Sequence, residues 1–204
     1  MAHRLVLGLL LFVFGTALVP AQSGDGAYVI RDVRVFDGED VTERQTVVIS
    51  DGTIAASGDS TIAVPSGAQE VAGQGRTLLP GLIDAHVHLP VFSSADALQQ
   101  NLAFGVTTVV VMWAPPQLVS QLKQFEATNR PDVASVITAG TGATAPGGHP
   151  TQMDPQAARL TPTLRSPDEA DAFVAARLAE GSDFIKIIYD DTNEAYGRTL
   201  PTLD

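Results

Sequence analysis

Short β-rich segments alternate with amphipathic helical segments along residues 82–189, and this alternation restricts the fold more than any other feature. Four segments have the apolar composition of buried strands: Leu82–Leu89, Val106–Trp113, Ser135–Ala139 and Asp183–Tyr189. Helical patterns separate them, with apolar residues such as Leu118 and Leu122 recurring on one stripe. This order predicts an α/β fold in which parallel strands are joined by right-handed helical crossovers.

A different pattern precedes these segments, in which short strands follow one another with no helix between them. Tyr28–Phe36, Gln45–Ile49 and Thr53–Ser57 have the composition of strands. The Asp51-Gly52 pair is a strong hairpin signal, because its residues tolerate the backbone angles of a tight turn. We therefore predict a small antiparallel, sandwich-like β domain of three or four strands within residues 22–77.

Composition indicates a globular chain and removes several classes of site. Of the 204 residues, 45% are hydrophobic and 17% are charged, which is enough to build a core. The net charge of -11 disfavours nucleic acid or an anionic membrane surface as a partner. The chain has no cysteine, so a metal would have to be held by histidine, carboxylate or a modified side chain.

The N-terminus has the pattern of an export signal. Arg4 precedes an apolar run, Leu5–Val19, that is short for a membrane span. Val19-Pro20-Ala21 fits a small-residue cleavage site, which predicts a signal peptide over residues 1–21, cleaved after Ala21, and a periplasmic or secreted protein. The alternative is an uncleaved membrane anchor. We expect no stable anchor after cleavage, and no cysteine near the cut supports a lipid-anchored form.

Two histidines end the first predicted strand of the parallel region. Because side chains alternate between the faces of a strand, His86 and His88 share a face, and Asp84 has the same parity. Two imidazoles and a carboxylate are ligand types for a divalent metal such as zinc. The alternative is a pair of hydrogen-bonded core histidines, but two of them on one face of a buried strand each need a partner.

Two further polar residues stand out beyond this pair. Lys186 lies within the apolar segment Phe184–Ile188, although lysine is rarely fully buried unless it is paired. An edge strand or a salt bridge would also explain it. His149 lies in the long loop Gly140–Arg165, where it could be an exposed residue, a substrate contact or part of a lid. We do not assign His149 as a metal ligand.

The segment Leu78–Leu89, with the sequence LLPGLIDAHVHL, resembles the first barrel strand of the amidohydrolase superfamily. The segments GVTTVV (residues 105–110) and FIKI (residues 184–187), together with the Gly-Gly-His loop, are most similar to its imidazolonepropionase-like and Xaa-Pro dipeptidase-like branch. The resemblance implies that residues 78–204 form the first four β/α units of a (β/α)8 TIM-type barrel, preceded by a small β domain.

The same resemblance implies a metal-dependent hydrolase. Its metal ligands would be His86, His88 and Lys186, the last carboxylated by CO2 so that its carbamate bridges two metal ions. The cofactor would be one or two divalent ions, with zinc favoured. Metal-activated water would then hydrolyse a C–N bond in a small cyclic amide, dipeptide or acyl amino acid. His149 would contact this substrate.

The sequence also departs from the family pattern. The family takes further histidines from its fifth and sixth strands and a general-base aspartate from its eighth, whereas the histidines here are His3, His86, His88 and His149. Residues 82–204 make up about half of the ~250 residues of a full barrel. We therefore expect a truncated chain that is inactive alone. The alternative is a non-catalytic β/α module that binds a ligand or partner.

Overall fold

The computed structural model describes residues 26–128, 130–153, 155–190, 192–193 and 197–203. The chain divides into two compact units between Pro80 and Gly81. The predicted signal peptide, residues 1–21, lies outside the described residues. Within the described part of the chain, no helix has both the length and the apolar character needed to cross a membrane.

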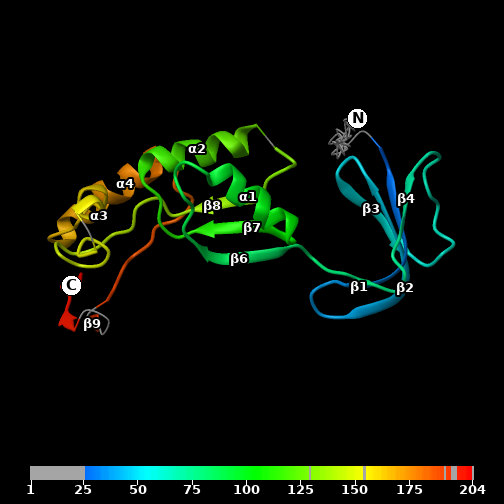
Figure 1. The fold of residues 1–204 in the computed structure, drawn as a ribbon, viewed down its shortest axis with the longest axis horizontal. Helices are drawn as coiled ribbons and strands as arrows, with labels where there is room; N and C mark the ends of the chain where they lie inside the picture. The colour runs from blue at the N-terminus through cyan, green and yellow to red at the C-terminus, as the bar shows by residue number, and fades with distance from the viewer. Residues whose placement is uncertain (1–25, 129, 154, 191, 194–196, 204) are drawn as a thin grey trace, which may run out of the picture. The chain divides into compact units, whose positions relative to one another are not determined.

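The N-terminal unit is one five-stranded sheet with the order β3-β2-β1-β4, in which β5 also pairs with β1 (Figure 1). Its strands are β1 (Tyr28–Phe36), β2 (Val41–Ser50), β3 (Thr53–Gly58), β4 (Gln69–Ala72) and β5 (Thr77–Leu78). Strands β1, β2 and β3 pair antiparallel, as predicted. Strands β4 and β5 pair parallel with β1, so the sheet is mixed, which corrects the expectation of a wholly antiparallel domain. The reason is that the chain leaves β3 at one edge and returns at the far side of β1.

The tight turn and the core of this sheet follow from its sequence. Asp51 and Gly52 both have positive φ, 51° and 71°, which matches the hairpin turn that an Asp-Gly pair favours. Four apolar side chains of β1 and β2 are buried: Val29, Val33, Val47 and Val48. Val29 and Val48 are direct partners across the two strands, so their contact supports the pairing.

The C-terminal unit contains the parallel sheet β6-β7-β8. Its elements in chain order are β6 (Leu82–Val87), α1 (Ser94–Ala103), β7 (Val106–Val111), α2 (Pro116–Ala127), β8 (Ser135–Thr138), α3 (Pro155–Leu160), the 3-10 turn η1 (Pro167–Glu169), α4 (Ala170–Glu180), β9 (Thr192–Asn193) and β10 (Arg198–Thr199). The predicted α/β class, with parallel strands that alternate with helices, is confirmed.

Helices α1 and α2 cover one face of this sheet (Figure 1). Leu98 of α1 and Leu118 and Leu122 of α2 are fully buried in one core cluster. Val109 and Val111 of β7 belong to the same cluster. The 3.6-residue spacing of the helical leucines places them on this side, because one stripe of an amphipathic helix faces the sheet.

The fourth predicted strand, Asp183–Tyr189, is not a regular strand. The N–H of Asp183 donates to the carbonyl of Thr138 at 2.8 Å, and the N–H of Ile188 donates to the carbonyl of Ala143 at 2.9 Å. Only an isolated parallel bridge, between Ala143 and Ile187, forms along this segment. Its neighbour β8 ends at Thr138, and Gly140 has a φ of 63°, so the adjacent chain turns and interrupts the ladder.

Candidate active site at the carboxyl ends of the parallel strands

A cavity of about 750 Å³ lies where the parallel strands end. His88 follows β6, Trp113 follows β7, and Lys186 lies on the segment beside the loop that follows β8. The cavity is lined by His86, His88, Val91, Trp113, Pro115, His149, Pro150, Met153, Gln156, Ala157, Leu160, Lys186, Ile188, Tyr189 and Asp190. Barrels built from parallel strands place their chemistry at this end.

The two histidines of the first strand lie together in this cavity. Their ring centroids are 5.3 Å apart, with the ring planes tilted by 57°. Asp84 has a different position: its Oδ1 accepts a hydrogen bond of 3.2 Å from the backbone N–H of His86, and it does not line the cavity. The pairing of β6 with β7 also has a register shift between Asp84 and Val87. Of the three residues predicted to share a face, the histidines reach the cavity and the carboxylate bonds to the backbone.

Lys186 lines the same cavity and is half-buried. Burial lowers the pKa of its amine below the ordinary lysine value. No ion pair joins Lys186 to an acidic side chain among the residues that the structure describes. Within that part of the chain, a salt bridge therefore does not account for this lysine.

His88 is affected by several neighbouring groups of the cavity. Desolvation lowers the pKa of its imidazole, and electrostatic interactions with Lys186 and His86 lower it further. His149 contributes in the same direction, whereas a hydrogen bond with the backbone of Trp113 acts against the shift. These groups therefore lie close enough to interact, and they favour the neutral imidazole, which is the form that binds metals.

The donor types in the cavity fit a divalent metal in part. His86 and His88 supply imidazole nitrogens, which suit zinc, and Lys186 would supply oxygen ligands only as a carbamate. Among the described residues, no three His, Cys, Asp or Glu side chains gather closely enough to hold an ion. The described donor set is therefore two histidines and one lysine, and further ligands would have to complete it.

The loop histidine reaches the cavity as well. His149 lines it together with His86 and Lys186, and its Nδ1 lies 3.0 Å from Nε2 of Gln152. The sequence placed His149 in a long loop, and the structure brings that loop over the strand ends. An imidazole here can donate or accept a hydrogen bond toward a bound molecule.

Sequence reasoning missed the apolar residues that line the cavity. Trp113, Met153 and Leu160 line it together with the polar groups. A signal existed for Trp113, because it is the last residue of the predicted strand Val106–Trp113, and parallel strands present their functional residues at this end. Met153 and Leu160 carried no comparable signal, since they come from a loop and from the short helix α3.

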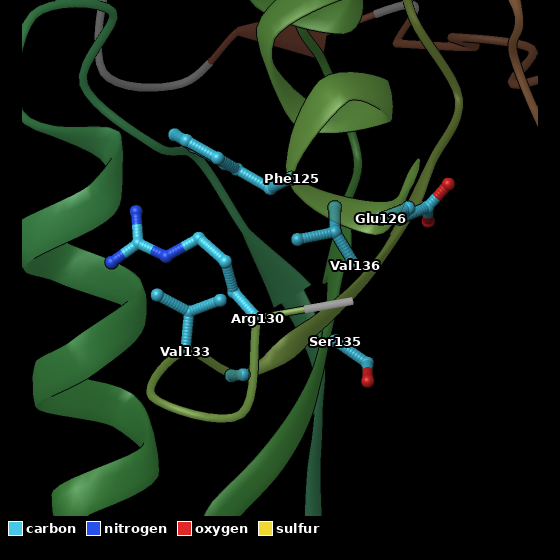
Figure 2. Close-up of a pocket in the computed structure, with 7 residues that line it drawn as sticks. Phe125, Glu126, Arg130, Val133, Ser135 and Val136 are labelled. Atoms are coloured by element: carbon cyan, nitrogen blue, oxygen red, sulfur yellow. The ribbon is translucent and has the colours of Figure 1, made fainter. Parts of the chain in front are cut away.

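A smaller cavity of about 230 Å³ lies at the opposite end of β8, where this strand begins. Figure 2 shows Arg130 extended between Phe125 and Val133. The guanidinium lies 5.6 Å from the Phe125 ring centroid, and its Nε is 2.9 Å from Oδ1 of Asp132. Hydrogen bonds from Arg130 hold the pKa of the Asp132 carboxyl well below its ordinary value. The charge of Arg130 at this cavity is thus already paired, whereas His86, His88 and Lys186 line the cavity at the other end of the sheet.

Two curated proteins are similar in sequence to part of the chain. No family model matches it. The imidazolonepropionase of Ectopseudomonas mendocina (strain ymp) is 44% identical over 107 residues, which are 50% of this chain and 26% of that protein. The enamidase of Eubacterium barkeri is 34% identical over 82 residues, which are 37% of this chain and 21% of that protein. The chain therefore matches about a quarter of the length of these relatives.

Solved structures extend the similarity to most of the chain. The crystal structure of an amidohydrolase superposes with a TM-score of 0.67 at 23% identity, covering 86% of this chain and 49% of that one. A Xaa-Pro dipeptidase with bound methionine gives 0.64 at 22% identity, covering 79% of this chain and 47% of that one. At such identities the likeness concerns the fold. Together with the sequence relatives, this likeness confirms that the chain resembles a portion of the proteins of the amidohydrolase superfamily.

Proposed function

We propose that this chain is part of a metal-dependent hydrolase that acts on C–N bonds of small molecules. The observation that carries the proposal is that His86, His88 and Lys186 line one cavity at the carboxyl ends of parallel strands. The relatives named imidazolonepropionase and enamidase support a reaction at a C–N bond.

His86 and His88 would hold the metal through neutral imidazoles, and Lys186 would do so as a carbamate. A bound divalent ion supplies Lewis acidity and makes water nucleophilic near neutral pH. His149 would hydrogen-bond the substrate from the loop above the strands. The general base is not assigned to a residue of this chain, and we expect an aspartate on a later strand to take that role.

The substrate class follows from the size of the cavity and from the relatives. A volume of about 750 Å³ lies within the range of small-molecule sites. We propose a small amide, either a cyclic amide or a dipeptide-like compound. The protein would be exported, with cleavage after Ala21. Mass spectrometry of the protein recovered from the periplasm or medium would show an N-terminus at Gln22; an intact N-terminus would contradict the cleavage.

A zinc titration tests the metal site directly. Isothermal calorimetry of residues 22–204 is expected to show zinc binding, weakened at least about 100-fold in His86→Ala and in His88→Ala, since each removes a ligand. His149→Ala, which lies in the same cavity, is the matched control and should bind zinc as the native chain does. Equal binding by all variants would reject the site and would favour a non-catalytic binding module.

An activity assay tests whether these residues turn over a substrate by themselves. We expect residues 22–204 with added zinc to show no turnover of amide or dipeptide substrates, because the described donor set is incomplete. Zinc-dependent turnover that His86→Ala abolishes would support the hydrolase and would contradict the proposed inactivity of these residues alone.

A further inference from the structure

The loop histidine of the cavity has one of its ring nitrogens in contact with a neighbouring side chain. Nε2 of Gln152 lies 3.0 Å from Nδ1 of His149, and the contact is partly buried. An amide nitrogen only donates hydrogen bonds, so Nδ1 of His149 accepts. In a neutral imidazole the other ring nitrogen then carries the proton, which places an N–H group at Nε2. The orientation of the Gln152 amide thereby assigns the tautomer of His149.

The second ring nitrogen of His149 is the one available to the cavity. His149 lines the cavity, whereas Gln152 does not. Within the part of the chain that the structure describes, no hydrogen bond joins Nε2 of His149 to another residue. His149 also interacts electrostatically with His88, so its ring lies near the histidine pair of the first strand. The N–H at Nε2 is therefore free to donate to a molecule in the cavity.

The backbone next to His149 is closely packed. The carbonyl of Gly148 accepts hydrogen bonds from the N–H of Thr151, at 2.9 Å, and from its hydroxyl, at 2.7 Å. Gly148 is buried, and a Cβ atom at this position would lie only 2.9 Å from the carbonyl oxygen of Pro201. The loop thus holds His149 and Gln152 in a fixed turn, which reduces the ordering cost when a ligand binds.

We propose that Gln152 is a positioning residue that keeps the proton of His149 on Nε2, so that His149 presents a hydrogen-bond donor to the substrate instead of a ligand to the metal. The donor fits a carbonyl or carboxylate oxygen, and the amides and dipeptide-like compounds proposed above carry such oxygens. A metal needs the lone pair of a ring nitrogen, but in His149 one nitrogen is protonated and the other accepts from Gln152. The roles toward substrate and metal rest on the proposed function, whereas the tautomer does not depend on it.

NMR spectroscopy of the histidine rings measures this tautomer in the 204-residue chain without metal. The sequence has four histidines, and the ring signals that are lost in His149→Ala identify those of His149. At alkaline pH, where imidazoles are neutral, long-range proton–nitrogen correlation spectra are expected to show the proton of His149 on Nε2. A proton on Nδ1 would overturn the proposal.

A substitution at Gln152 reverses the polarity of the contact. In Gln152→Glu the carboxylate only accepts hydrogen bonds, so the proton of His149 is expected to move to Nδ1. Thr151→Ala is the matched control, because the hydroxyl of Thr151 bonds to the loop backbone, and this variant should leave the proton on Nε2. Circular dichroism confirms that each variant is folded. A proton that stays on Nε2 in Gln152→Glu would show that Gln152 does not set the tautomer and would overturn the proposal.

Adding zinc to the same samples separates this inference from the proposed hydrolase. Zinc is expected to shift the ring signals of His86 and His88 and to leave the proton of His149 on Nε2. Loss of that proton on addition of zinc would make His149 a metal ligand and would overturn the proposal. A fixed Nε2 tautomer in a chain that binds no zinc would retain the positioning role of Gln152 and reject the metal-dependent function.

Discussion

Asp183 and Thr138 are joined by a reciprocal pair of hydrogen bonds. The N–H of Asp183 donates to the carbonyl of Thr138 at 2.8 Å, and the N–H of Thr138 donates to Oδ2 of Asp183, also at 2.8 Å. This pair attaches the start of the segment that carries Lys186 to the end of β8. It supplies a fixed point where a regular ladder does not form.

Asp183→Ala is therefore expected to destabilise the C-terminal unit by about 1–3 kcal/mol, because it leaves the Thr138 N–H without its acceptor. Asp183→Asn keeps an acceptor oxygen and should cost less. Urea unfolding followed by Trp113 fluorescence measures both variants. Equal stability of Asp183→Ala and the native chain would show that the reciprocal pair does not stabilise this segment.

Lys123 adds an ion pair to the same carboxylate, with Nζ 2.6 Å from Oδ1 of Asp183. Desolvation opposes the charged amine, but hydrogen bonds with Asp183 and Glu126 outweigh it and raise the pKa of Lys123 above its ordinary value of 10.5. The resulting stabilisation is fully present below that ordinary value and is lost as the pH rises through the higher folded-state pKa.

Lys123→Met should thus lower the free energy of unfolding by at most about 1 kcal/mol at neutral pH, since the pair is partly exposed to solvent. The difference from the native chain should shrink at pH values above 10.5. Urea unfolding at a series of pH values measures it. A difference that grows in alkaline solution would contradict the assigned sign.

The leucines of α2 and α4 provide a matched test of the core. Leu122 is fully buried, whereas Leu178 is 65% exposed. Leu122→Ala is expected to lower the free energy of unfolding by about 2–5 kcal/mol, because apolar burial is lost and a cavity remains. Leu178→Ala is expected to change it by no more than about 0.5 kcal/mol. Similar losses in the two variants, measured by urea unfolding, would contradict the described packing of α2.

Carboxylation of Lys186 can be tested cleanly because the sequence contains only two lysines, Lys123 and Lys186. With 13C-bicarbonate and zinc, we expect a carbamate carbon signal in the NMR spectrum of the chain. The signal should be absent in Lys186→Arg and should persist in Lys123→Arg. A signal that survives Lys186→Arg would place the carbamate elsewhere.

Patterns among residues that are close in the chain predicted much of the secondary structure and the histidine pair of the candidate site. The Asp51-Gly52 turn follows from residues that tolerate positive φ, and the alternation of strands and helices follows from the spacing of apolar residues. The convergence of His86 and His88 follows from their i, i+2 spacing near the end of a strand. Each of these depends on interactions between residues that are close in the chain.

Other features depended on contacts between distant segments, and the sequence pattern misjudged or missed them. Residues 183–189 were expected as a strand, but their neighbour turns away after β8. Strand pairing is set by the partner as much as by composition, which is why this outcome could not be predicted locally. One local contact was misjudged as well: the Asp84 carboxylate, expected beside the histidines, accepts a hydrogen bond from the backbone N–H of His86, two residues along the chain.

The sequence by itself determined the α/β class, the tight hairpin of the N-terminal sheet, and the identity of the polar residues that suit a metal. Only the tertiary structure decided that β4 pairs parallel with β1, and that Trp113, Met153 and Leu160 meet in one cavity with those polar residues. The physical reason is the separation along the chain over which each kind of interaction acts. Turn geometry and apolar periodicity act over a few residues, whereas a cavity wall forms from side chains that are brought together by the folding of separate segments.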